Sequence, residues 1–210
     1  MINSHAADKA TVDKFLPDIF DIEAGALLKD AMGAPSLLPL FLMGQENEDI
    51  AHKAVERAKA YLVGVLQECY DLGHLKILAH SDGETAYGYA LLFAHPGQPE
   101  LPLYMHKIYV HEQYRGQGMG SAMLTALEGH ESGVTLLCHG NLTPFYEARG
   151  YEVKGIYGDQ PTPDHMSDTA GIYSGLTLMT NGKAKTTASA IFMLNNDDTM
   201  NIAKALTQAV

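Results

Sequence analysis

Apolar and polar positions along this chain follow two different periods. Over 17–32 and over 47–73, apolar residues recur every three or four positions, the pattern of a helix with one buried face. Pro17 suits the first turn of the first helix, and Asn47 the amino-terminal cap of the second. Later, short apolar runs bounded by turn residues, such as Ser81-Asp82-Gly83-Glu84, predict strands. The predicted strands are 75–81, 85–95, 101–111, 133–139, 151–158 and 170–180, with helices over 119–130 and 141–149 between them.

The order of these elements predicts the fold class. Strands that follow one another through short turns pair antiparallel, whereas strands separated by a helix can pair in parallel. Helices that alternate with strands pack on the faces of the sheet. We therefore expect an α/β (α+β) fold with a mixed, mostly antiparallel central sheet and helices on both faces.

Three segments depart from this regular pattern. Residues 34–44 hold two prolines in an apolar run, which predicts an irregular, mostly buried connector. Residues 159–168 are polar and proline-rich and predict a loop. Residues 181–210 are expected to add a strand over 186–194 and a helix over 197–209. This extension either covers a sheet edge within the subunit or forms a homodimer contact, because an exposed edge needs cover in both cases.

The stretch Met105–Leu127 carries the strongest chemical signal. It runs from an apolar strand through Gly116, Gly118 and Gly120 into a helix. The backbone N–H groups at such a helix start have no partner within the helix, and the positive end of the helix dipole lies behind them. Glycines let the backbone approach a ligand closely. This arrangement predicts an anion site, most often for phosphate, with Arg115 adding a positive charge at its rim.

Three kinds of phosphate-binding loop contain such glycines. A Walker loop needs G-x-x-x-x-G-K-[ST], which the sequence lacks. A dinucleotide fold needs G-x-G-x-x-G directly after a strand, but Ser121 stands where the last glycine belongs and the next strand ends without an acidic residue. The third kind fits. Gln113-Tyr114-Arg115-Gly116-Gln117-Gly118 resembles the Q/R-x-x-G-x-G/A signature of the GCN5-related N-acetyltransferases (GNAT), whose loop holds the pyrophosphate of acetyl-CoA.

A second motif supports the same family. Asn141-Leu142-Thr143-Pro144-Phe145-Tyr146-Glu147-Ala148-Arg149-Gly150-Tyr151 resembles the later N…FYExxGF segment of these enzymes. The resemblance implies a GNAT-like sheet, acetyl-CoA as co-substrate, and transfer of the acetyl group to a primary amine of a small molecule or peptide by direct attack in a ternary complex. The resemblance covers roughly residues 75–180. We expect an acyltransferase domain over 1–180, with helices in 17–73 and a core in 75–180, followed by the extension 181–210.

The resemblance assigns cofactor-binding roles to particular residues. In the family, a splay between the fourth and fifth strands admits the pantetheine arm, and main-chain groups of the fourth strand contact it. By position, Ile108 and Val110 make these contacts, and Asn141 matches a residue that hydrogen-bonds the arm. The hydroxyl of Ser121 joins the loop amides at the pyrophosphate. Those amides belong to Arg115, Gly116, Gln117, Gly118, Met119 and Gly120.

Two side chains are expected to move protons. Tyr146 aligns with the family tyrosine that protonates the departing sulfur, and a phenol with an ordinary pKa of about 10 is protonated at neutral pH. Many relatives carry a glutamate at the position of Lys107, so the usual carboxylate base is missing here. His106, which shares a strand face with Tyr104, Ile108 and Val110 by alternation, resembles the histidine of arylalkylamine acetyltransferases. It is the expected base, directly or through water, and a structural histidine is the alternative.

Charge and cysteine content limit the function further. A net charge of -11 argues against a nucleic acid or a membrane as partner and favours a cationic substrate such as an amine, although solubility alone also explains it. Cys69 and Cys138 form neither a disulfide framework nor a C-x-x-C pair, and the histidines show no H-x-x-x-H spacing, so no metal is expected. With no apolar leader or membrane span, the expected location is the cytoplasm.

Two other functions are compatible with a phosphate-binding loop. A non-catalytic acyl-CoA-binding sensor or interaction module needs the loop but neither Tyr146 nor His106. A nucleotide-cofactor enzyme is disfavoured by the missing acidic residue. No cysteine stands near the loop motif, so a covalent intermediate is not expected.

Overall fold

The computed structural model describes residues 5–32, 48–157, 173 and 175–207. The predicted connector at 34–44 and the predicted loop at 159–168 lie outside these residues. The chain divides into two compact units. The first comprises Met1–Leu16, Tyr70–Gln160 and Gly175–Phe192, and the second comprises Pro17–Cys69, Pro161–Ser174 and Met193–Val210.

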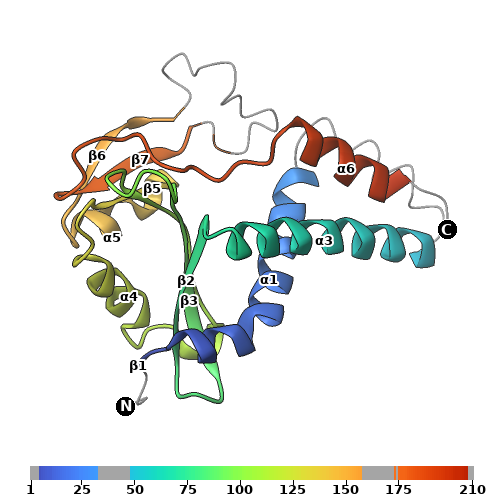
Figure 1. The fold of residues 1–210 in the computed structure, drawn as a ribbon, viewed down its shortest axis with the longest axis horizontal. Helices are drawn as coiled ribbons and strands as arrows, with labels where there is room; N and C mark the ends of the chain where they lie inside the picture. Colours follow the sequence, from blue (N-terminus) through green and yellow to red (C-terminus); the bar gives the residue numbers. More distant parts are fainter. Residues whose placement is uncertain (1–4, 33–47, 158–172, 174, 208–210) are drawn as a thin grey trace. The chain divides into compact units, whose positions relative to one another are not determined.

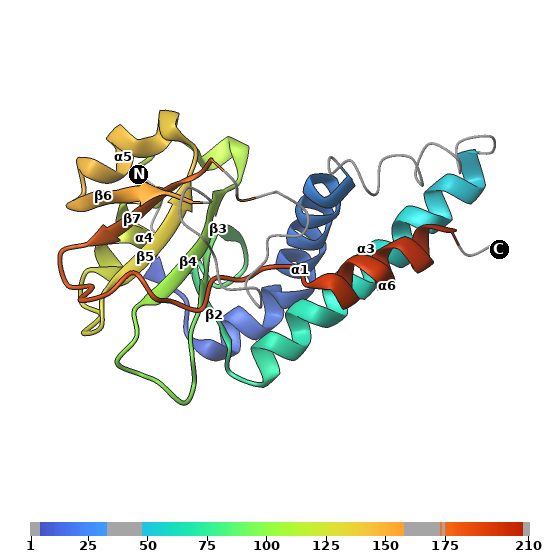
Figure 2. The ribbon, with the colours of Figure 1, turned by 90° about the horizontal axis from the view of Figure 1, so that it is seen from above.

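The first unit is built on one sheet, in which the described strands follow the order β1-β2-β3-β4-β5-β7-β6 (Figures 1 and 2). Neighbouring strands pair antiparallel except β4 and β5, which pair in parallel. The predicted mixed, mostly antiparallel sheet is therefore confirmed. The strands are β1 (His5–Ala6), β2 (Leu75–Ser81), β3 (Ala86–Phe93), β4 (Leu103–Val110), β5 (Val134–Cys138), β6 (Tyr151–Ile156) and β7 (Thr177–Asn181).

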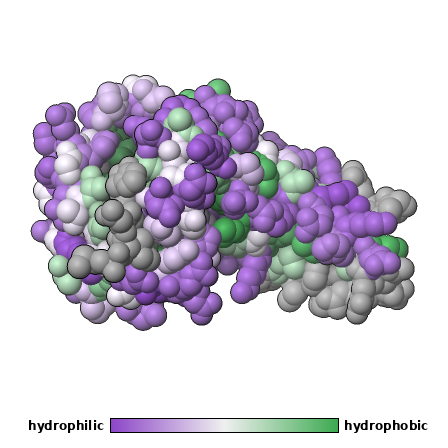
Figure 3. Space-filling model, turned by 90° about the horizontal axis from the view of Figure 1, so that it is seen from below, coloured by the Kyte–Doolittle hydropathy of each residue, from purple (hydrophilic) through white to green (hydrophobic). Residues whose placement is uncertain are grey.

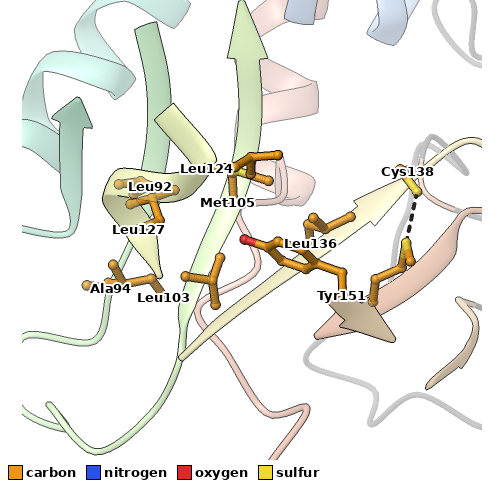
Figure 4. Packing of buried hydrophobic residues seen from close by; sticks show 11 residues of the cluster. Leu92, Ala94, Leu103, Met105, Leu124, Leu127, Leu136, Cys138 and Tyr151 are labelled. Atoms are coloured by element: carbon orange, nitrogen blue, oxygen red, sulfur yellow. Dashed lines mark hydrogen bonds between the residues drawn. The ribbon is translucent and has the colours of Figure 1, made fainter. Parts of the chain in front are cut away.

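Helix α4 (Met119–Leu127) packs on one face of this sheet because its apolar side chains recur with the helical period. Leu124 and Leu127 of α4 join Leu92 of β3 and Met105 of β4 in a buried cluster (Figure 4). The short helix α5 (Thr143–Glu147) lies beside α4 on the same side of the sheet (Figure 1). This layer therefore places the loop before α4 next to α5.

The first turns of α1 (Lys9–Met32) lie against the opposite face. Val12 of α1 lines a shallow hollow together with Leu75 and Ile77 of β2, whereas Leu78 packs against the cluster under α4. Successive side chains of a strand point to opposite faces. Helices therefore cover both faces of the sheet, as predicted.

Helix α1 begins at Lys9 and not near Pro17, as the proline had suggested. Asp8 caps it, because its carboxylate accepts a hydrogen bond from the N–H of Thr11 at 2.8 Å. Pro17 lies inside the helix, where it lacks the N–H that would pair with the carbonyl of Asp13. The cap, not the proline, sets the start of this helix.

Residues 186–194 do not form the predicted strand and follow an irregular path. Their side chains pack on the sheet instead. The hydroxyl of Ser189 accepts a hydrogen bond from Thr135 of β5 at 2.7 Å, and the ring of Phe192 stacks on Phe93 of β3 with 4.6 Å between centroids. The apolar pattern of this segment therefore reflects contact with a sheet face and not pairing at an edge.

Gly133 fixes the start of β5. It has a φ of 80°, and a Cβ atom here would lie 2.3 Å from the nitrogen of Ala184 and 2.8 Å from Oδ1 of Asn181. The carbonyl of Gly133 accepts a hydrogen bond from the N–H of Leu103 at 3.1 Å, and Val134 donates its N–H to Asn181 Oδ1 at 3.0 Å. The absence of a side chain thus lets β5 begin in close contact with β4 and with the turn after β7.

The second unit contains the rest of α1, most of α3 (Glu48–Asp71) and α6 (Asn196–Thr207), so the predicted helices in this part are found. The carboxylate of Asp198 connects α6 to α3 by accepting a hydrogen bond from the Tyr61 hydroxyl at 2.7 Å. The same carboxylate accepts a hydrogen bond from the N–H of Asn195 at 2.9 Å. Asn195 is the residue that caps α6. Arg57 of α3 donates to the carbonyl of Ala205 at 3.2 Å.

On the face drawn in Figure 3, hydrophilic side chains predominate and apolar ones are scattered. None of the helices in the described ranges combines the length and the hydropathy that crossing a bilayer requires.

Candidate active site

The glycine loop connects β4 to α4 and is anchored to β3. After β4, a single 3₁₀ turn (Glu112–Tyr114) leads into Arg115. The N–H of His111 donates to the carbonyl of Tyr87 at 3.0 Å, and the ring of Tyr114 packs edge-on against the ring of Tyr87 with 4.6 Å between centroids. These contacts fix the position at which the loop begins.

Six consecutive backbone N–H groups, from Gly116 to Ser121, donate no hydrogen bond to any described residue. The helix uses none of them, because its first bond runs from the N–H of Ala122 to the carbonyl of Gly118 at 2.9 Å. Gly116 and Gly118 have φ values of 75° and 83°, a region that favours glycine. Open donors at the positive end of a helix dipole are suited to bind an anion.

Arg115 differs from the prediction that its amide faces the anion. Its N–H donates to the carbonyl of Glu112 at 3.1 Å and closes the 3₁₀ turn, and its Nε donates to the carbonyl of Val110 at 3.0 Å. The hydrogen bond of the 3₁₀ turn thus uses this N–H group just before the glycines begin. Arg115 can therefore offer an anion only its guanidinium charge.

The hydroxyl of Ser121 is held by Arg149, which follows α5. Arg149 donates to Ser121 Oγ from Nη2 at 2.6 Å and from Nε at 3.2 Å, and to the carbonyl of Phe145 from Nη1 at 2.6 Å. The guanidinium lies 3.8 Å from the centroid of the Phe145 ring. That ring in turn lies 3.9 Å from where a Cβ atom of Gly120 would be. These contacts dock α5 on the first turn of α4.

Strands β4 and β5 separate after a short parallel contact. Toward Val110, β4 keeps only β3 as its partner, while β5 keeps only β7 as far as Cys138. The sheet therefore opens between β4 and β5, and main-chain groups near Ile108 face the opening without a strand partner among the described residues. The parallel contact consists of the pairs Leu103–Val134, Tyr104–Thr135 and Met105–Leu136.

A β-bulge in β4 changes the alternation on which one prediction depended. Leu91 of β3 faces Lys107 and Leu92 faces Met105, so His106 has no residue opposite it. The extra residue shifts the side chains that follow it by one position relative to the faces of the sheet.

His106 and Ile108 consequently point to opposite faces. The predicted shared face is correct for Tyr104, whose ring lies 6.1 Å from that of His106, and wrong for Ile108 and Val110. Ile108 packs against the cluster under α4. The imidazole of His106 packs edge-on against Phe93 and Phe192, with centroid distances of 5.8 and 5.4 Å. Phe93 lies on the other face, because its neighbour Leu92 belongs to the cluster under α4.

The surroundings of His106 keep its imidazole neutral. Its Nδ1 atom is buried and has no hydrogen-bond partner among the described residues. Burial among aromatic rings, helped by the charge of Lys107, lowers the pKa of His106 to about 4. The ring is therefore uncharged at physiological pH.

Tyr146 lies on the α4 side of the sheet. Its half-buried ring packs against the core cluster and meets the rings of Phe145 and Tyr151 edge-on at 5.1 and 5.8 Å. Burial, with a smaller contribution from Cys138, raises the pKa of Tyr146 to about 12. The phenol thus keeps its proton at neutral pH. Tyr146 and His106 lie on opposite faces, with the opening between β4 and β5 separating them.

The comparison with known families gives the same identification as the motifs. Residues 73–153 match the family model described as the acetyltransferase (GNAT) domain. This segment is a GNAT domain. The predicted family is confirmed for this segment, and with it the class of acetyltransferase.

Solved structures of acetyltransferases are similar to this chain at low sequence identity, and the first of them supports the fold. A Corynebacterium glutamicum protein described as histone acetyltransferase HPA2 and related acetyltransferase is 18% identical, with a TM-score of 0.50 over 88% of this chain and 98% of that one. An acetyltransferase from Thermus thermophilus is 15% identical, with a TM-score of 0.48 over 86% and 97%. PaiA N-acetyltransferase from Thermoplasma acidophilum, in complex with coenzyme A, is 13% identical, with a TM-score of 0.44 over 86% and 99%. The search of curated proteins gave no match.

The remaining predicted residue of the GNAT domain, Asn141, lies just past the opening. It belongs to the 3₁₀ turn Gly140–Leu142 between β5 and α5, and its side chain is exposed. In the chain it follows the end of β5, where that strand has left β4.

The sequence did not reveal two side chains near this site. Arg149 stands in the second motif, but its contact with Ser121 depends on how α5 docks on α4. Cys138 lies close enough to affect Tyr146, which the sequence did not indicate. Its thiol is buried, with Sγ 3.7 Å from Sδ of Met179 (Figure 4), and burial raises the pKa of Cys138, so it is poorly suited to be a nucleophile.

The described part of the chain contains no cluster of three or more His, Cys, Asp or Glu side chains that could hold a metal ion.

Proposed function

We propose that this GNAT domain transfers the acetyl group of acetyl-CoA to a primary amine of a small molecule or peptide, by direct attack of the amine in a ternary complex. The observation that carries the proposal is the row of open N–H groups from Gly116 to Ser121. A diphosphate has the charge and the oxygen acceptors that such a row can bind.

The proposed binding mode uses the open donors and the split in the sheet. The amides of Gly116, Gln117, Gly118, Met119 and Gly120 hold the diphosphate, and the Ser121 hydroxyl adds a donor. Main-chain groups of Ile108 and Val110 contact the pantetheine arm in the opening between β4 and β5, and Asn141 bonds it from the β5 side. Arg115 contributes through its guanidinium only, since its amide is already paired.

The proposed reaction places the two proton-handling groups on opposite sides of the opening. A neutral amine attacks the thioester carbonyl from the His106 side, a C–N bond forms and the C–S bond breaks. Tyr146, which is protonated at neutral pH, gives its proton to the departing sulfur on the α4 side. His106 accepts the proton lost by the amine and passes it to water, since an imidazole with a pKa of about 4 does not retain it, and Tyr146 regains a proton from water. The products are an N-acetyl amide and free coenzyme A.

Release of coenzyme A tests this proposal. The protein is mixed with acetyl-CoA and a panel of primary amines, including small polyamines, arylalkylamines and peptides with free amino termini, and the free thiol is measured. Amine-dependent thiol release is the expected result. Tight binding of acetyl-CoA without turnover across the panel would support a sensor or interaction module instead, and thermal stabilisation by NAD but not by acetyl-CoA would contradict both.

The low pKa of His106 predicts a specific dependence of stability on pH. In the unfolded chain the imidazole takes up a proton near pH 6.5, whereas in the folded protein it does so only near pH 4. Stability from this group is therefore complete above pH 6.5 and is lost as pH falls toward 4. Urea denaturation of the wild type should show a loss on the order of 2 kcal/mol between pH 7 and pH 4.5 from this source.

His106→Leu is the matched variant for this measurement, because leucine fills the aromatic pocket but does not titrate. Its loss of stability over the same pH interval should be smaller than that of the wild type by that amount. If His106 also relays a proton, the same variant lowers kcat at pH 7 without changing the Kd of acetyl-CoA. Equal losses of stability in the two proteins would mean that His106 titrates normally in the folded state.

A further inference from the structure

Arg149 supplies positive charge at the glycine loop of an acidic protein. The sequence contains three arginines, Arg57, Arg115 and Arg149, against a net charge of -11. Arg115 leads into the loop, and Arg149 contacts Ser121 in the first turn of α4. Among the described residues, Arg149 has no carboxylate partner, and its printed contacts are a hydroxyl, a carbonyl and an aromatic ring. Its charge is therefore not neutralised by these neighbours.

The hydrogen bonds of Ser121 determine where its hydroxyl hydrogen can point. A serine hydroxyl has one hydrogen to donate and two lone pairs that accept. Nη2 and Nε of Arg149 both donate to Ser121 Oγ, at 2.6 and 3.2 Å, and so occupy its acceptor positions. The hydrogen is left to donate away from Arg149. Ser121 ends the row of open N–H groups, so an anion bound there is within reach of this donor.

The guanidinium is fixed in place before any ligand binds. Its plane lies over the ring of Phe145 at 3.8 Å, and Nη1 donates to the carbonyl of the same residue at 2.6 Å. The ring of Phe145 lies beside the first turn of α4, at an ordinary contact distance of 3.9 Å from where a Cβ atom of Gly120 would be. A lysine at 149 could bring the charge, but not the fixed pair of guanidinium donors that converge on Ser121 Oγ.

We propose that Arg149 is a positioning residue for the diphosphate of acetyl-CoA, acting through Ser121. It orients the Ser121 hydroxyl to donate to the diphosphate and places a positive charge beside it. The proposal rests on the proposed function, since it assumes that the glycine loop binds this diphosphate.

A double-mutant cycle in the full-length protein tests the proposal. The variants are Arg149→Met, Ser121→Ala and the double variant, with Arg149→Lys as a charge-preserving comparison. We expect Arg149→Met to raise the Kd of acetyl-CoA, measured by calorimetry, by about tenfold, the effect of one hydrogen bond to a charged group. Adding Ser121→Ala should weaken binding by no more than about a further twofold, because Arg149 acts through that hydroxyl. The kcat at saturating acetyl-CoA should stay the same while KM rises.

Independent effects that multiply to about a hundredfold in the double variant would overturn the positioning role. Full recovery of affinity in Arg149→Lys would also overturn it, because a point charge would then suffice. If Arg149→Met lowers the Tm of the unliganded protein, Ser121→Ala tests the same contact. It removes only a hydroxyl group and should therefore keep the fold.

Two fragments of coenzyme A locate the contact. ADP contains the diphosphate without the 3′-phosphate, and 3′-phospho-ADP contains both. If Arg149→Met raises the Kd of both fragments by the same factor, the contact is with the diphosphate. An increase in Kd confined to 3′-phospho-ADP contradicts this contact. If the wild type binds acetyl-CoA and all variants bind it equally well, only the role of Arg149 is overturned. Wild-type protein that fails to bind acetyl-CoA overturns the proposed function as well.

Discussion

Replacing Tyr146 by phenylalanine is expected to lower kcat by about a hundredfold and to leave the Kd of acetyl-CoA within about twofold. Phenylalanine keeps the ring that packs against Phe145, Tyr151 and the core cluster, so the fold and the cofactor site are preserved. Only the hydroxyl is lost, and with it the proposed acid for the departing sulfur. Steady-state kinetics and calorimetry on the same preparation give the two quantities.

Tyr151→Phe is the matched control for this prediction. Its ring meets that of Tyr146 at 5.8 Å, and its hydroxyl is buried without a hydrogen-bond partner in the described part of the chain. Removing that hydroxyl should leave kcat unchanged and should not reduce stability, since an unsatisfied buried group is removed. Equal losses of kcat and of acetyl-CoA affinity in Tyr146→Phe would refute the acid role and indicate a packing role for the phenol.

Replacing Gly133 by alanine is expected to reduce the free energy of unfolding by about 3 kcal/mol. A non-glycine residue in the left-handed region costs about 1–2 kcal/mol, and forcing an extra methyl group into a packed site costs about 1–3 kcal/mol more. Both costs apply here, because φ is 80° and the new Cβ atom would lie 2.3 Å from the nitrogen of Ala184. Urea denaturation followed by circular dichroism measures the change.

Gly129→Ala serves as the comparison, because nothing lies within 4 Å of a Cβ atom at that position and no positive φ is involved. It should change stability by less than about 0.5 kcal/mol. A loss below about 1 kcal/mol in Gly133→Ala would show that the turn carrying Ala184 shifts easily. Since Gly133 accepts a hydrogen bond from Leu103, the damaged variant should also lose acetyl-CoA affinity through the β4–β5 contact.

The parts of the site that the sequence predicted are those encoded by local spacing. Alternate glycines before a helical apolar period predict a loop with open amides, and the amides of Gly116 to Gly120 are open in the structure. The strands 75–81 and 85–95 were recognisable because a turn signal separates two apolar runs. Such features depend on residues near one another in the chain, so a single sequence contains the information.

The features that were missed depend on distant residues. The bulge at His106 has no glycine to mark it and is visible only from the pairing of β4 with β3. The contact between Arg149 and Ser121 requires α5 to dock on α4. The apolar residues of 186–194 pack on a sheet face, which a periodicity shared with strands cannot distinguish from edge pairing. Arg115 was assigned an open amide because the 3₁₀ turn before it was not foreseen.

The divergence of β4 from β5 comes from the path of the main chain, since the two strands share only the pairs from Leu103–Val134 to Met105–Leu136. Side-chain substitutions along β4 would therefore change the residues that border the opening between β4 and β5 without closing it. In the proposed binding mode, acceptor preference can therefore change through exchange of the bordering side chains, while the opening proposed to admit the acyl donor is kept.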